Sequence, residues 1–100
     1  MARSYSQGFL ETLNTMDPNN LGVQLAKLCV KANLPTLYVA RKVGVSRFTV
    51  HSWFRGQRIR DKNKIKVNAF IELVKNGFSN GRLPVANPSD AKYYLNSVEL

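Results

Sequence analysis

The sequence predicts an all-α protein, a compact bundle of about five to six short helices. Three observations lead to this fold class. Apolar residues recur at helical spacing through most of the chain, glycine and proline punctuate these stretches, and good N-cap residues precede several of them. A hydrophobic content of 44% in 100 residues suits one domain with a modest core.

Two helices are predicted in the N-terminal third. The first, 6–16, is indicated by one apolar stripe. That stripe consists of Phe9, Leu10, Leu13 and Met16. Asp17 and Pro18 then supply an N-cap and a residue suited to a first helical turn, and they predict a second helix that runs to Ala32. Its apolar arc is wide, so we expect it to contact more than one neighbour.

Two shorter helices follow, with a turn between them. Pro35 is tolerated in a first helical turn but not in an interior, so it separates the second helix from a helix over 36–43. Gly44 favours a left-handed stop, and Ser46 is a suitable N-cap for a helix over 47–55.

The C-terminal half is predicted to hold a long helix. Gly56 ends the preceding helix, and a basic loop, 57–61, follows it. Asp61 is the N-cap that we predict for a helix over 62–76, and Gly77 is expected to close it.

Beyond this helix the composition changes to glycine, proline, asparagine and serine, which indicates an ordered loop. Ser89 or Asp90 is predicted to cap a last short helix that ends near Val98. The chain is thereby divided into an N-terminal helical arm (1–16), a central core (17–77) and a C-terminal loop with a short helix (78–100).

Positive charge is concentrated in one part of the chain. The formal net charge is +9, and the window 41–66 carries +8 of it, with nine basic residues and a single acid, Asp61. A protein that needs charge only for solubility mixes its signs. Charge gathered in this way predicts a polyanionic partner, either nucleic acid or an anionic membrane surface.

The helix over 47–55 divides into an apolar face and a polar face. Val50, Trp53 and Phe54 fall within one arc and are predicted to point inward. The opposite side carries Arg47, Phe48, His51, Ser52 and Arg55. Two helices joined by a short turn with a glycine form a helix-turn-helix unit, whose second helix can enter the major groove of DNA.

The run V-A-R-K-V-G-V-S-R-F-T-V-H-S-W-F-R-G resembles the helix-turn-helix of the phage Cro and repressor family. The positions that match the family pattern are Val39, Ala40, Val43, Gly44, Val45, Ser46, Val50, Trp53 and Gly56. The resemblance is close over the two short helices and extends over 18–77 only as helix count and order. It implies a lambda-repressor-like fold, a phage or bacterial origin and repressor-like regulation.

The resemblance also implies roles for individual residues. Base readout is implied for Arg47, Phe48, Thr49, Ser52 and Arg55. Phosphate contacts are implied for Thr36, His51, Arg58, Arg60, Lys62 and Lys64. An arginine suits guanine because its planar fork matches the O6 and N7 atoms together.

Two residues depart from the family pattern. Pro35 stands where the family often has a capping threonine or serine, which leaves Thr36 to make any phosphate contact there. Phe48 occupies a position that is usually polar. It either contacts a thymine methyl group or packs against a neighbouring side chain, and the sequence leaves both open. A homeodomain interpretation of V-H-S-W-F-R-G-Q-R is less favoured, because Gly56 stands where that family needs an asparagine.

Other classes of function find little support. His51 is the only histidine and has no carboxylate at helical spacing, and no phosphate loop or paired-carboxylate motif is present, so we do not expect an enzyme. Cys29 is the single cysteine, which excludes an intramolecular disulfide and favours a reducing, cytoplasmic setting. No long apolar run or secretory signal is evident, and we expect no cofactor and no metal.

The sequence therefore predicts a sequence-specific regulator, repressor-like, that binds double-stranded DNA through the helix over 47–55. We expect a homodimer, because one recognition helix reads few base pairs. The candidate dimer surfaces are Phe9, Leu10 and Leu13, and Tyr93, Tyr94 and Leu95. The alternative is a protein-interaction module on the same scaffold that binds RNA polymerase or another regulator. RNA is less favoured because a helix cannot read the narrow A-form major groove.

Overall fold

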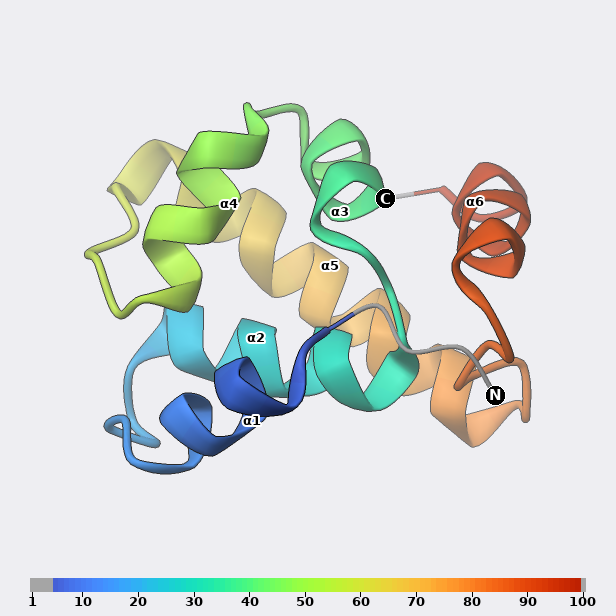
Figure 1. Ribbon diagram of the computed structural model, residues 1–100. Coiled ribbons are helices and arrows are strands. Elements are labelled where there is room, and N and C mark those ends of the chain that lie inside the picture. The colour runs from blue at the N-terminus through green and yellow to red at the C-terminus, as the bar shows by residue number, and fades with distance from the viewer. Residues whose placement is uncertain (1–4, 100) are drawn as a thin grey trace.

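The computed structural model describes residues 5–99, and this part of the chain contains six helices joined by turns and loops. They are α1 (Gln7–Asn14), α2 (Leu21–Ala32), α3 (Thr36–Val43), α4 (Arg47–Phe54), α5 (Asp61–Ser79) and α6 (Pro88–Asn96). Strands are absent from these residues, so the predicted all-α fold class is confirmed. Figure 1 shows α5 running diagonally behind the other helices, with α3 and α4 above it, α1 and α2 below it and α6 to the right.

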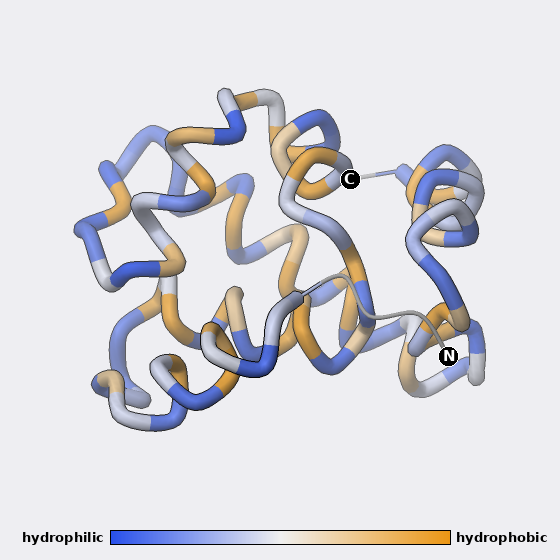
Figure 2. The backbone as a smooth tube through the Cα atoms, in the orientation of Figure 1, coloured by the Kyte–Doolittle hydropathy of each residue, from blue (hydrophilic) through white to orange (hydrophobic). Residues whose placement is uncertain are grey.

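One hydrophobic core is shared by the helices. Its largest fully buried side chains include Phe54 of α4, Phe70 of α5 and Leu25 of α2. The wide apolar arc predicted for α2 is used as expected, because α2 packs against α1, α4 and α5. Figure 2 shows hydrophobic stretches turned toward the middle of the bundle and hydrophilic stretches along its outside. No helix within residues 5–99 has both the length and the apolar character needed to cross a membrane.

The start of α2 differs from the prediction. Asp17 does not cap the helix: its carboxylate accepts the N–H of Asn19 at 2.9 Å within the preceding turn. Asn20 is the N-cap, and its Oδ1 accepts the N–H of Val23 at 3.1 Å. Both residue types accept such bonds equally well, so the sequence alone does not choose between them.

The starts of the last two helices are also shifted. Asp61 is the first residue of α5, where its charge suits the helix N-terminus, and Arg60 precedes it without a side-chain cap. The prediction of Ser89 or Asp90 as the cap of α6 is wrong. Asn87 takes that place, and its Oδ1 accepts the N–H of Asp90 at 3.2 Å.

Gly77 does not end a helix. It is buried within α5, which continues to Ser79. A Cβ atom at Gly77 would lie 2.5 Å from the hydroxyl of Tyr94 and 2.6 Å from Cδ1 of Leu83. The glycine therefore provides space for α6 and the segment before it to approach α5, rather than a left-handed turn.

The C-terminal segment is hydrogen-bonded to the turn after α2. The N–H of Val85 donates to the carbonyl of Ala32 at 3.1 Å, and Nδ2 of Asn33 donates to the carbonyl of Val85 at 3.2 Å. Asn33 ends α2 in the left-handed conformation, with φ of 61°, and its side chain is buried. Residues 83–95 thus complete the core of the preceding helices.

Most residues of the two dimer surfaces that the sequence suggested are buried or half-buried within the monomer. Leu13, Tyr94 and Leu95 all belong to the buried core. Phe9 is half-buried against that core, and Tyr93 is 74% exposed. The apolar stripes of α1 and α6 are therefore used mainly inside the monomer.

Candidate nucleic-acid interface

α3 and α4 are joined by the three-residue turn 44–46. Gly44 has φ of 84°, and its N–H donates to the carbonyl of Ala40 at 2.8 Å, which confirms the predicted left-handed end of α3. Ser46 is confirmed as the N-cap of α4, because its Oγ accepts the N–H of Thr49 at 3.1 Å. The local sequence therefore determines where α4 begins.

The inner face of α4 is fixed by close packing. Val50, Trp53 and Phe54 are all buried, as their spacing predicted. The backbone of α4 also touches that of α2: a Cβ atom on Gly22 would lie 2.2 Å from the carbonyl oxygen of Trp53. Only glycine permits this approach, so the position of α4 relative to α2 is set at the backbone.

The end of α4 is held by a residue that the sequence reasoning missed. Gly56 has φ of 92°, and the N–H of Gln57 donates to the carbonyl of Ser52 at 3.0 Å, which closes the helix. Nδ2 of Asn20 donates to the carbonyl of Gly56 at 2.9 Å while its Oδ1 caps α2. One asparagine therefore joins the start of α2 to the end of α4. Its only sequence signal is its place just before α2.

The outer face of α4 is cationic, polar and aromatic. Arg47, Phe48, His51 and Arg55 are exposed, whereas Thr49 and Ser52 are half-buried. Phe48, Ser52 and Arg55 stand at positions i, i+4 and i+7, which places them along one stripe. Phe48 is 81% exposed, so packing against a neighbour, one of its two predicted roles, is not seen here.

One edge of this face meets α3 and α1. Nε2 of His51 lies 3.5 Å from Oγ1 of Thr36, which brings the first residue of α3 beside the middle of α4. His51 and Arg55 also line a hollow with Phe9 of α1. The ring of Phe9 stacks on that of Phe54, with centroids 6.2 Å apart, and so anchors α1 against α4.

The remaining phosphate candidates lie at the C-terminal end of α4 and beyond it. Arg58 and Arg60 are exposed in the loop after α4, and Lys62 and Lys64 are exposed in the first turn of α5. This loop projects at the left of Figure 1 and is largely hydrophilic in Figure 2. Arg58 and Lys64 share a hollow with Gly56. Lys64 is partly neutralised, because its Nζ lies 3.3 Å from Oδ1 of Asp61.

Arg47 and Arg55, at the two ends of α4, form no ion pair within the described residues. The two ion pairs found within residues 5–99 join Lys64 to Asp61 and Lys75 to Glu72, and neither involves α4. Arg47 and Arg55 are therefore available to a ligand. In the same part of the chain, no group of His, Cys, Asp and Glu side chains is arranged to hold a metal ion.

Cys29 lies away from this face, fully buried in α2. Burial raises the pKa of its thiol well above the ordinary value, so the group stays protonated and unreactive in the folded protein. Its role is that of a small apolar side chain in the core.

Comparison of the chain with protein-family models, with curated proteins and with solved structures found no match. The functional assignment therefore rests on the residues and the geometry of this chain.

Proposed function

We propose that this protein binds double-stranded DNA in a sequence-specific manner, with α4 in the major groove, and acts as a repressor-like regulator. The observation that carries the proposal is the outer face of α4. It presents Arg47 and Arg55 at its two ends and Phe48 between them, all exposed and free of ion pairs within residues 5–99.

The dimensions of α4 suit this role. A helix with its side chains is about 10–12 Å across, and the B-DNA major groove is about 12 Å wide. Arg55 supplies a planar donor pair that matches guanine, and Ser52 supplies a hydroxyl on the same stripe. These residues would read base edges, because they lie on the exposed stripe of a helix whose inner half is fixed.

The basic residues beside α4 would supply affinity rather than sequence preference. Arg58 and Arg60 are exposed and close to the end of α4, where the DNA backbone borders the groove. Contacts to phosphates position a protein on DNA and release counterions, but they carry no sequence information. This role would account for the seven basic residues of 47–66, whereas Arg41 and Lys42 of the same window lie on α3.

Two measurements test the proposal together. Selection from a random duplex library should yield an enriched sequence, and a palindrome in it would reveal a dimer and its half-site spacing. Affinity for that sequence should fall with salt at a log–log slope of roughly −4.5 to −6.3, the value for about five to seven neutralised phosphates. An affinity that does not change with salt would contradict DNA binding.

Matched substitutions separate readout from backbone contact. Arg55→Gln should change the preferred sequence and cost about 1–3 kcal/mol at one base pair. Arg58→Gln should weaken all duplexes alike and make the slope shallower by about 0.9. If a protein such as RNA polymerase were the true partner, it would stay bound when Arg47, Arg55 and Arg58 are all neutralised.

A further inference from the structure

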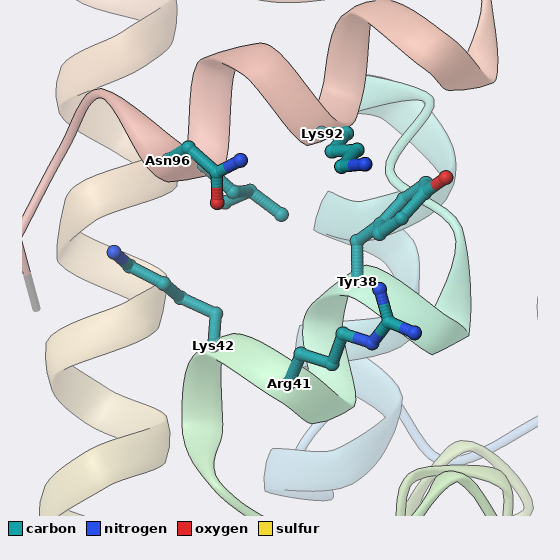
Figure 3. Close-up of a pocket in the computed structure, with 6 residues that line it drawn as sticks. Tyr38, Arg41, Lys42, Lys92 and Asn96 are labelled. Atoms are coloured by element: carbon teal, nitrogen blue, oxygen red, sulfur yellow. The ribbon is translucent and has the colours of Figure 1, made fainter.

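A second group of cations lies on the far side of α3 from α4, where α3 meets α6. The two helices lie side by side (Figure 1) and enclose a pocket of about 120 Å³. The residues that line it are Tyr38, Arg41 and Lys42 from α3 and Lys92, Leu95 and Asn96 from α6. Figure 3 shows these side chains around the opening, with Asn96 opposite Lys42 and with Lys92 above Tyr38.

The pocket is positively charged without an internal counter-charge. Among the residues that the structure describes, no aspartate or glutamate lines it. Asp90 is only two residues before Lys92, but two helical positions are roughly 200° apart, and Asp90 lines a different hollow beside Arg82. Neither ion pair within residues 5–99 involves Arg41, Lys42 or Lys92. Figure 3 shows the ammonium of Lys42 directed away from Arg41 and Lys92, which lie on the Tyr38 side of the opening. An anion between Arg41 and Lys92 would offset the repulsion of these two cations.

Part of the pocket is held in place before any ligand arrives. The ammonium group of Lys42 donates to the carbonyl of Val98, which ties α3 to the chain just after α6. Leu95 is buried at the base, and Asn96 is exposed and offers an amide donor.

We propose that this pocket binds a phosphate group, with Arg41 and Lys92 as its charged ligands and Asn96 as an additional donor. The volume of about 120 Å³ leaves room for a tetrahedral oxyanion of five heavy atoms. A guanidinium and an ammonium group are donors that proteins use for phosphate. The proposal stands apart from DNA binding by α4, because it uses none of the residues on the outer face of that helix.

The direct test is a titration with inorganic phosphate, followed by NMR through the Asn96 side-chain amide and the Arg41 Nε–H. We expect saturable shifts in the wild-type protein and at least a tenfold weaker response in the double variant Arg41→Gln/Lys92→Gln. Both residues are exposed, so these changes leave the fold intact. The control is Lys27→Gln/Lys75→Gln, which removes the same charge elsewhere and should bind phosphate as the wild type does.

Shifts that rise linearly with phosphate, or that equal those from chloride at the same ionic strength, would overturn the proposal. So would equal phosphate binding by the two double variants.

A second experiment, with duplex DNA, shows whether the phosphate comes from a DNA backbone or from a free molecule. If the pocket holds a backbone phosphate, Arg41→Gln/Lys92→Gln should reduce the salt slope by about 0.9 more than the control does. If the salt slopes of DNA binding are equal for the two double variants, and the wild-type protein binds inorganic phosphate, the ligand is a free phosphorylated molecule. A protein that binds phosphate here but no DNA would refute the proposed function and leave this site standing.

Discussion

An exposed phenylalanine on a cationic helix face is costly to leave in water. Covering a phenylalanine side chain is worth about 1.5–3 kcal/mol, and Phe48, in the first turn of α4, is 81% exposed on its outer face. Packing of Phe48 against a neighbouring side chain is not seen in the part of the chain that the structure describes. Contact with a thymine methyl group stays a prediction of the proposed function.

A double-mutant cycle between protein and DNA tests this contact. On the selected duplex, replacing the contacted thymine by uracil removes only the C5 methyl group. We expect a loss of about 0.8 kcal/mol, or roughly fourfold in affinity, with the wild-type protein. With Phe48→Ala the same replacement should have no effect. An equal methyl effect in both proteins would show that Phe48 does not touch the methyl group.

Cys29 provides a prediction about pH. Burial raises the pKa of its thiol in the folded state above the ordinary value of about 8.5, so the folded state retains a proton that the unfolded state loses. Stability is therefore complete below about pH 8.5 and falls above it, by up to about 1.4 kcal/mol per pH unit for this group. Urea unfolding from pH 7 to 10 measures the fall, and Cys29→Ala should flatten the curve. A curve of unchanged steepness in that variant would exclude the thiol as the cause.

At the scale of elements, the sequence predicts most of the architecture. The fold class and the boundary signals at Gly44 and Ser46 are correct, because a left-handed glycine and a serine cap act through their immediate neighbours. The errors at Asp17 and Gly77 have another origin. Near Asp17, several residues that can cap a helix follow one another. At Gly77, the glycine is required by the close approach of the Tyr94 side chain, 17 positions away in the sequence.

The candidate site is predicted less completely. The exposed arginines of α4 follow from helical periodicity, but Asn20, which fixes the end of α4 from 36 positions away, does not. The pocket between α3 and α6 is likewise invisible in the sequence, because its cations come from segments about 50 residues apart that only the fold brings together.

Alanine substitutions at two glycines test how α4 is positioned. Gly22→Ala places a methyl group against the Trp53 carbonyl, and backbone cannot move aside cheaply, so we expect a loss of about 1–3 kcal/mol or more in unfolding free energy. Gly8→Ala in α1 meets nothing within 4 Å and should be neutral or stabilising by about 0.5–1 kcal/mol. Thermal or urea unfolding distinguishes the two. Similar stabilities for both variants would mean that the contact between α2 and α4 is not tight.

At the scale of the whole molecule, Asn33 joins the first part of the core to the last. Asn33→Gly keeps the left-handed backbone but removes the donor to the Val85 carbonyl, which should cost about 1–3 kcal/mol. The segment after Arg82 should then open more often. Tryptic cleavage at Arg82, which is exposed, reports this opening, and it should be faster in the variant. Unchanged stability and unchanged cleavage would show that the bond contributes nothing.

The attachment of α4 also determines which partner must adapt. Its start is capped by Ser46, its middle lies against Gly22, and its end is bound by Asn20, so the helix cannot tilt or unwind without breaking these contacts. Little conformational entropy is then lost by its backbone on association. If α4 binds DNA as proposed, any bending or widening needed for a close fit has to occur in the DNA. Sequences that deform easily should therefore be preferred even at base pairs that α4 never touches.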